Sequence, residues 1–243
     1  MNDTLNTPHH ADYETNLEAN FNAAMKMCAD KYDYDKLIML LSSDKIIKKQ
    51  IAVLELKEIK SVKDAQMLVA NLVGQDGKIR EAVAFKMNEL ADNPQYCSYF
   101  KGEKVYATLL EGIMDINGNV CRQIVSGKWF DDNDFQAYLC DKLPERINEI
   151  LAEIEKLEQN SKQYVISKRN FQLYWCLEAL YNIIEVIDCQ KIKQILLKTS
   201  EFYDYTIREK TAKIIAKLNN SELNELEIKL KNDENYYVRR YFE

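Results

Sequence analysis

Glycine and proline are scarce in this chain, whose 243 residues include only six Gly and three Pro. Folds rich in β-turns need more of both residues, since average usage is about 7% for Gly and about 5% for Pro. No apolar run approaches the roughly 20 residues that a bilayer-spanning helix requires. With 47% hydrophobic and 30% charged residues, the composition indicates a folded and almost entirely helical protein.

The histidines and cysteines exclude several kinds of chemistry. The two histidines, His9 and His10, fall in the polar stretch 1–15, which we expect to be a flexible tail. A folded part without histidine offers neither a His general base nor a His-ligated zinc site. The six cysteines never form a C-x-x-C pair, so we interpret them as reduced core thiols of a cytoplasmic protein. We therefore expect no metal, no cofactor and no catalytic residue.

The net charge of the chain limits the kinds of molecule that it is expected to bind. The net charge of −6 and the pI near 5.2 argue against a surface built for nucleic acid, because phosphate binding needs a concentrated positive field. The densest basic run, six lysines between 45 and 63, is interleaved with glutamates. It is typical of a solvated helix face, with a patch for an anionic partner as the alternative. Neither nucleic acid nor a membrane is expected as a partner.

A short phrase occurs five times and predicts a repeat protein. It joins an Asp or Asn to an Ile or Val three residues later and then to a residue that is basic in four copies. Successive copies start 32, 41, 87 and 31 residues apart, so three intervals fit one helical hairpin each and the long one fits two hairpins plus an insertion. The copies begin at Asp44, Asp76, Asn117, Asp204 and Asn235.

Each position of the phrase has a structural use. The Asp or Asn can accept a hydrogen bond from the N–H groups that open the second helix of a hairpin. The aliphatic residue is expected to point into the core. A small or β-branched residue five positions later would let neighbouring repeats approach closely. These later positions are Ala52, Ala84, Val125 and Ala212.

This pattern, D-x-x-[VI]-R followed by a small residue, resembles the HEAT-repeat superfamily over most of residues 33–243. The resemblance implies an all-α fold, a right-handed α-solenoid of about five to six HEAT-like hairpins, with a ladder of turn Asp and helix Arg between repeats. An uncharged residue, as at Asn117, Asn235 and Cys121, would weaken that ladder. The ladder members would be Asp76, Asp204, Arg80 and Arg208. The structural repeat residues are Asp44, Asp76, Arg80, Asn117, Asp204, Arg208, Asn235 and Arg239.

The expected domain organisation follows from the spacing of the phrases. After the tail, residues 16–130 hold the N-terminal repeats and 161–243 hold the C-terminal repeats of one continuous solenoid. Between them, 131–160 form an insertion with an amphipathic helix, whose apolar residues lie along one side and whose other side is dense in Glu and Lys. This helix would pack either on the solenoid or on a partner.

Aromatic residues gather around the last two phrases and predict a site for a protein partner. Tyr205 and Tyr236 occupy the same position in consecutive repeats, so stacking would align them along one edge. Exposed aromatic rings are enriched as interface anchors; the alternative is that they wedge the turns between repeats. The predicted partner-binding residues are Phe202, Tyr203, Tyr205, Tyr236, Tyr237 and Tyr241.

The function predicted from these features is that of a non-enzymatic scaffold or adaptor, since solenoid surfaces bind by area and need no reactive residue. The partner would be another protein, with a second copy docked at the C-terminal end as the alternative. The sequence does not name the partner or the pathway.

An enzymatic alternative comes from a second resemblance. Trp129-Phe130-Asp131, then Asp134, then Arg169 are similar in order and spacing to the residues of the alkylpurine DNA glycosylases that are built from HEAT-like repeats. That resemblance implies that Phe130 contacts the lesion, Asp134 stabilises the developing sugar cation and Arg169 holds a backbone phosphate. The competing explanation is an acidic cluster that opens a helix and is favoured by the helix dipole.

Overall fold

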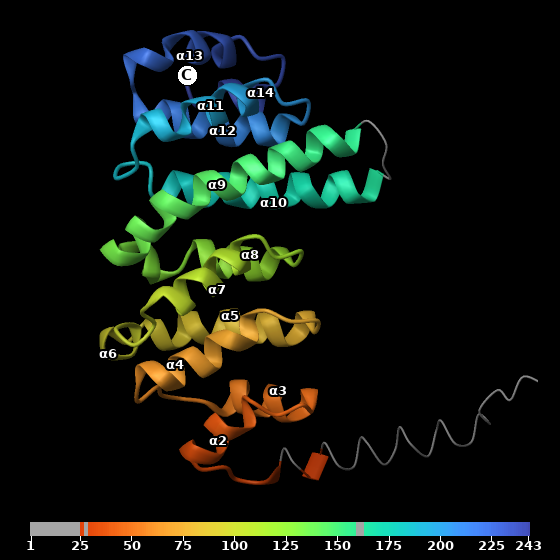
Figure 1. Ribbon diagram of the computed structural model, residues 1–243, viewed down its shortest axis with the longest axis vertical. Helices are drawn as coiled ribbons and strands as arrows, with labels where there is room; N and C mark the ends of the chain where they lie inside the picture. The colour runs from red at the N-terminus through yellow and green to blue at the C-terminus, as the bar shows by residue number, and fades with distance from the viewer. Residues whose placement is uncertain (1–24, 27–28, 159–162) are drawn as a thin grey trace, which may run out of the picture. The chain divides into compact units, whose positions relative to one another are not determined.

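The protein is all-α in every part that the computed structural model describes (Figure 1). Contacts divide the chain into two units, residues 1–57 and 58–243. The expected tail at 1–15, with both histidines, lies outside the described residues. The described residues are 25–26, 29–158 and 163–243.

Between residues 29 and 57 the first unit has the short helices α2 (Tyr34–Leu40) and α3 (Ile46–Glu55). Here the prediction for the first phrase is wrong in its local detail, because Asp44 is exposed and does not cap α3. The N-cap is Lys45, which makes no side-chain capping bond, and its own N–H donates to Oγ of Ser43 at 3.2 Å. The helix therefore begins one residue later than it does in the other copies.

The second unit consists of helical hairpins arranged in two layers, with short helical turns between them. The first layer holds α4 (Val62–Val69), α7 (Glu103–Ile113), α9 (Asn133–Glu158), α11 (Cys189–Ser200) and α13 (Asn224–Lys231). The second layer holds α5 (Gly77–Ala91), α8 (Gly118–Val125), α10 (Gln163–Asn182), α12 (Tyr205–Leu218) and α14 (Tyr236–Arg239). The short turns are η1 (Ala70–Leu72), α6 (Pro94–Cys97), η2 (Lys128–Asp131) and η3 (Ser221–Leu223).

Stacking of these hairpins makes the second unit an α-solenoid. Each first-layer helix contacts the next in the order α4, α7, α9, α11, α13, and each second-layer helix contacts the next in the order α5, α8, α10, α12, α14. The two helices of each hairpin also contact each other, and the layers can be followed in Figure 1. The predicted helical repeat solenoid is therefore confirmed for this unit.

The core of the second unit uses the phrase as predicted. The aliphatic residue of each phrase in this unit is at most 6% exposed, and the residue five positions later is buried wherever the helix continues. This arrangement removes apolar surface from water on the inner side of each second-layer helix, which is the main stabilising contribution to packing. The aliphatic residues are Ile79, Val120, Ile207 and Val238. The later residues are Ala84, Val125 and Ala212.

The stretch 131–160, expected as an insertion, contains α9, the first helix of a hairpin with α10. α9 contacts α7, α10 and α11, and it contributes the fully buried Phe135, Leu139 and Leu143 to the core. α9 has 26 residues and α10 has 20, against 8 in α8. The long interval between phrases therefore spans two hairpins, and its additional residues lengthen α9 and α10, which extend past α8 and α12 (Figure 1).

Candidate functional site

Four of the five phrases open a second-layer helix with a side-chain cap. In each, the Asp or Asn has an extended backbone, and its Oδ1 accepts a hydrogen bond at 2.9 Å from the backbone N–H two residues later. These bonds satisfy N–H groups that have no partner within the helix. The capping residues are Asp76 in α5, Asn117 in α8, Asp204 in α12 and Asn235 in α14.

The fifth residue of the phrase hydrogen-bonds the turn that precedes the phrase, and so connects that turn to the helix that the phrase opens. In three copies an arginine Nη1 donates to the main-chain carbonyl six residues earlier. These pairs are Arg80 with Gly74 at 2.6 Å, Arg208 with Phe202 at 2.8 Å and Arg239 with Asp233 at 2.6 Å. In α8 the Sγ–H of Cys121 donates to the carbonyl of Asp115 at 3.1 Å. Burial, helped by the charge of Asp115, raises the pKa of this thiol to about 12, so it keeps its proton as a donor.

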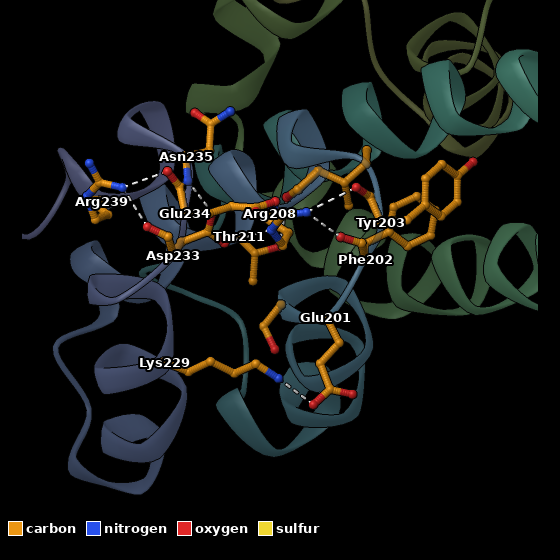
Figure 2. Close-up of polar contacts among 12 residues, drawn as sticks. Glu201, Phe202, Tyr203, Arg208, Thr211, Lys229, Asp233, Glu234, Asn235 and Arg239 are labelled. Carbon is orange, nitrogen blue, oxygen red and sulfur yellow. Dashed lines mark hydrogen bonds and ion pairs between the residues drawn. The ribbon is translucent and has the colours of Figure 1, made fainter.

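Two of these arginines also join consecutive repeats. Nε and Nη2 of Arg80 bind the two carboxylate oxygens of Asp115 at 2.5 and 3.0 Å. The same atoms of Arg208 bind Asp233 at 2.7 and 3.1 Å (Figure 2). All four side chains are between 7% and 12% exposed, and bidentate Arg–carboxylate pairs are among the stronger hydrogen-bonded contacts in proteins. Each pair forms one rung between repeats.

The acid of each rung differs from the one that the HEAT resemblance implied. Asp76 and Asp204, the predicted ladder acids, use Oδ1 for capping the helices of their own phrases. The rung acids lie two residues before the phrases that open with asparagine, and they also accept the N–H of Asn117 at 2.7 Å and of Asn235 at 2.8 Å. The rung acids are thus Asp115 and Asp233, where the resemblance implied Asp76 and Asp204, and their partners are Arg80 and Arg208.

A sequence signal for the rung acids exists, although it was missed. Both belong to an Asp-x-Asn spacing, Asp115-Ile116-Asn117 and Asp233-Glu234-Asn235, and each follows an arginine phrase by one repeat. The HEAT resemblance predicts that an uncharged Asn in the phrase weakens the ladder. Each Asn instead lies two residues after the aspartate whose carboxylate binds the arginine of the preceding phrase.

The junction between α8 and α10 is held differently. With Cys121 in place of arginine, no Arg–Asp rung joins these two helices in the part of the chain that the structure describes. Amide groups of α10 act there instead: Nδ2 of Asn182 donates to the carbonyl of Val125 at the end of α8 at 2.7 Å, and Nε2 of Gln172 donates to the carbonyl of Met114 at the end of α7 at 2.7 Å. Neutral amides can replace the rung because both carbonyls lie at the ends of helices, where intrahelical partners are lacking.

Replacing Asp233 with asparagine is predicted to reduce stability at neutral pH and to flatten the acid limb of the stability profile. Burial alone would raise the pKa of Asp233, but the bonds from Arg208 and the Asn235 N–H and the charges of Arg208 and Arg239 outweigh it, so the pKa is lowered. With a depressed folded-state pKa, the stabilisation is present above the unfolded-state pKa of about 3.9 and is lost as the pH falls through the folded value. Urea unfolding at a series of acid pH values measures this, and parallel profiles for variant and parent would contradict it.

The predicted partner-binding residues, here called the aromatic edge, lie just before and at the start of α12 and in and just after α14. Tyr203, Tyr205, Tyr236 and Tyr237 are between 41% and 56% exposed. The rings of Tyr205 and Tyr237 are stacked with centroids 6.3 Å apart, and Tyr236 lies edge-on to Tyr237 at 5.8 Å. The edge therefore connects two repeats. Its members are Phe202, Tyr203, Tyr205, Tyr236, Tyr237 and Tyr241.

Contacts at the periphery hold the aromatic edge in place. The guanidinium of Arg240 lies 5.2 Å from the ring centre of Tyr237 and 5.1 Å from that of Tyr241, and its Nη2 donates to Glu209 at 2.7 Å. Tyr241 also donates its hydroxyl to Glu209, at 3.2 Å. At the other end Phe202 and Tyr203 are stacked at 4.7 Å. Several rings of the edge are thus held by contacts within the chain, and preorganisation of this kind lowers the entropic cost of binding.

A cavity of about 320 Å³ lies between α10 and α12 beside the aromatic edge. It is lined by Ser167, Asn170, Phe171, Tyr174, Asp204 and Thr206. Next to it the two helices are joined by Glu178, which binds Nζ of Lys210 at 2.6 Å and Nζ of Lys213 at 2.7 Å. The same lysines lie over the rings of Tyr174 and Tyr181, at 4.4 and 3.9 Å from the ring centres. The surface next to the edge therefore combines tyrosine rings with charged groups that already have partners.

The residues of the glycosylase alternative do not form a site. Trp129 is 2% exposed and its Nε1 donates to the carbonyl of Ile124 at 2.6 Å, while Phe130 packs edge-on against Phe135. Arg169 forms an ion pair with Glu153 at 2.6 Å.

The predicted catalytic acid of that alternative is far from the predicted phosphate ligand. Asp134 is at the opposite end of α9 from Glu153, and the 19 intervening steps of 1.5 Å correspond to about 28 Å along the helix. The aromatic residues Trp129 and Phe130 are thus core residues, and Phe130, Asp134 and Arg169 do not meet. The DNA glycosylase prediction is not supported.

Other kinds of site receive no support from the side chains. Within residues 25–26, 29–158 and 163–243, no three His, Cys, Asp or Glu side chains come together to hold a metal ion. No helix in those same ranges combines the length and apolar character needed to cross a bilayer. Five cysteines are free thiols: Cys97, Cys121, Cys140, Cys176 and Cys189.

Comparison with known proteins does not place the chain in a family. No protein-family model and no curated protein sequence matches the chain. Among solved structures, a designed armadillo repeat protein, YIII(Dq)4CqI, is similar over 86% of this chain and 96% of its own, with 14% sequence identity and a TM-score of 0.42. That likeness is too distant to add an argument to the architecture described above.

Proposed function

We propose that the protein is a non-enzymatic scaffold or adaptor that binds another protein through the aromatic edge. The observation that carries this proposal is the exposure of four ordered tyrosines on two consecutive repeats, 41–56% each. Rings that only wedged the turns between repeats would be buried in those turns. Tyrosine supplies a large contact area at a low cost in side-chain entropy, and for this reason it is enriched among the residues that dominate binding energy.

The second-layer surface beside the edge supports the same proposal. The cavity between α10 and α12 adjoins the edge through Asp204 and Thr206, so an anchor side chain could enter it while the flanking segment lies on the rings. A protein partner is favoured over a small molecule because the exposed rings span two repeats, whereas small-molecule sites are concave and enclosed.

Three finer assignments belong to the same proposal. We propose that the repeats are of the HEAT type, supported by the cap, aliphatic and arginine positions of the phrase. We propose a cytoplasmic location, supported by the free thiols, because disulfides form mainly in oxidising compartments. A homodimer through the C-terminal end is the alternative to a different protein partner, and light scattering at several concentrations separates the two.

Removing two rings of the aromatic edge is expected to abolish partner binding and leave the fold intact. Tyr205→Ala with Tyr236→Ala removes exposed rings, and surface changes of that kind usually alter stability by no more than about 0.5 kcal/mol each. Two interface anchors at roughly 2 kcal/mol each would lower affinity by about a thousandfold. Quantitative co-purification from cell extract measures retention, and circular dichroism and thermal melting report the fold.

The matched control is Tyr164→Ala, because Tyr164 is 75% exposed on α10 and is not a member of the edge. A photo-reactive amino acid at position 236 should cross-link the partner directly, and the same group at position 164 should not. A folded double variant that retains every partner, or cross-linking from position 164 alone, would refute the aromatic edge.

A further inference from the structure

The first layer contains a groove whose lining includes no residue of the aromatic edge. It has a volume of about 420 Å³ and lies between α7 and α9, with Val73 at one end. Its floor is apolar and is formed by Val73, Ala107, Leu110 and the ring of Tyr138. Val73 is 46% exposed, although apolar side chains are usually covered when a neighbouring helix is available. The floor therefore offers apolar surface that a partner could remove from water.

The lining of this groove carries three carboxylates, Glu111, Glu145 and Glu149, and two basic side chains, Lys142 and Arg146. Lys142 forms an ion pair with Asp141 at 2.9 Å. At the rim of the groove, Glu111 on α7 faces Glu145 and Glu149 on α9. Arg146 forms ion pairs with Glu111 and with Glu149, the second at 2.9 Å. No ion pair involves Glu145 in the described part of the chain. One guanidinium of the chain itself thus binds the rim and leaves a carboxylate available.

Net negative charge is concentrated in α7 and α9. By sequence, α7 carries two carboxylates and one lysine, and α9 carries seven carboxylates against three basic residues. Together they hold a net −5 of the chain's −6. By the same count the second-layer helices α10, α12 and α14 hold a net +5. α11, the first-layer neighbour of α9, carries three lysines, so the acidic surface is confined to α7 and α9. Charge complementarity therefore favours a basic partner at the groove between these two helices.

We propose that the groove between α7 and α9 docks a basic amphipathic helix of a partner protein. Helix-in-groove recognition places apolar anchors at i, i+3 or i+4 into an apolar floor, and here Lys or Arg residues beside those anchors would meet Glu111, Glu145 and Glu149. The surface differs from the aromatic edge and lies on the other layer. The protein would then bind two partners at once, and failure of this proposal would leave the aromatic edge untouched.

The test uses the full chain and two synthetic peptides of roughly 18 residues, about five helical turns. Both contain the same Leu, Lys and Ala; one has Leu at helical spacing and the other is scrambled. Fluorescence anisotropy at about 0.1 M salt should show binding of the first peptide at least tenfold tighter than of the second, and binding should weaken at about 1 M salt, where charges are screened within about 3 Å. Equal binding of both peptides would overturn the proposal by showing unspecific attraction.

Variants locate the binding on the molecule. Glu145→Lys should weaken binding by about tenfold, because an attractive rim charge becomes repulsive and about 1.4 kcal/mol corresponds to a factor of ten. Its matched control is Glu225→Lys on α13, which makes the same change of charge at an exposed position and should alter binding by less than about twofold.

Filling the groove tests the apolar floor separately from the rim charge. Thr108→Trp, at a half-buried position in the lining, should remove binding while circular dichroism and melting show an intact fold. Equal effects of Glu145→Lys and Glu225→Lys, or full binding by a folded Thr108→Trp variant, would overturn the proposal. Loss of peptide binding in the Tyr205→Ala, Tyr236→Ala variant would also overturn it, since that result places the peptide on the aromatic edge.

Discussion

Replacing Asp115 with alanine is expected to destabilise the protein by about 3–5 kcal/mol, the usual cost of removing one partner from a buried ion pair. The side chains of Arg80 and Asp115 are 9% and 7% exposed, so the guanidinium left behind is largely shielded from water and has lost both of its carboxylate bonds. The variant also loses the acceptor of the Asn117 N–H. Equilibrium unfolding in urea measures the change, and the effect should appear in the midpoint more than in the slope.

A variant at Asp76 distinguishes this rung from the ladder that the HEAT resemblance implied. Asp76→Ala removes a helix cap and should cost only about 1 kcal/mol. The double variant Arg80→Met with Asp115→Leu should recover much of the loss, because an apolar pair of similar volume often replaces a buried ion pair without penalty. If Asp76→Ala cost as much as Asp115→Ala, the rung would be wrongly assigned.

Local features of the fold could be predicted from sequence because their causes are local. A cap depends on one side chain and the N–H two or three residues later, so the phrase was sufficient to place the starts of α5, α8, α12 and α14. The buried aliphatic residues follow from helical periodicity in the same way. Asp44 shows the limit of this approach, because the pattern is present there while the helix begins after Lys45.

Contacts between repeats could not be predicted with the same accuracy. The partner of Arg80 lies 35 residues away, and which of several acids occupies that position depends on how two hairpins stack. The same holds for the aromatic edge: Tyr205 and Tyr236 are equivalent in sequence, yet Tyr205 stacks on Tyr237. Which tyrosine of the next repeat meets Tyr205 depends on how the helices stack, and the equivalence of Tyr205 and Tyr236 in sequence does not show it.

Order along the chain was also a poor guide to spatial proximity. The aromatic run and the acidic and basic residues of the glycosylase alternative follow one another as that family requires, but α9 separates Asp134 from the position of Arg169 by most of its length. The length of α9 also explains why its stretch resembled an insertion. A 26-residue helix exceeds the usual repeat helix, and length alone does not show whether extra residues form an insert or extend a helix.

Gly127→Ala is expected to destabilise the protein by about 3–5 kcal/mol, a cost similar to losing a packed tryptophan. Gly127 has φ −78° and ψ 153°, a backbone conformation that alanine adopts freely, so the backbone itself gives no reason for glycine. The reason is Trp129, because a Cβ on residue 127 would overlap the indole atoms Cε2, Cζ2 and Nε1. The ring must leave its buried position and give up the hydrogen bond to the Ile124 carbonyl.

A double-mutant cycle makes this explanation testable. In a Trp129→Ala background the obstruction is absent, so adding Gly127→Ala should cost almost nothing, and the coupling between the two positions should be about 3 kcal/mol. Gly77→Ala is the matched control: its Cβ would come only within 3.7 Å of Arg80 Nη2, in a helix where alanine is favoured, and it should be neutral or stabilising by about 0.4–1 kcal/mol. Unfolding in urea gives all the values. An equal cost of Gly127→Ala in both backgrounds would show that the glycine is required by the backbone and that Trp129 has no part in the requirement.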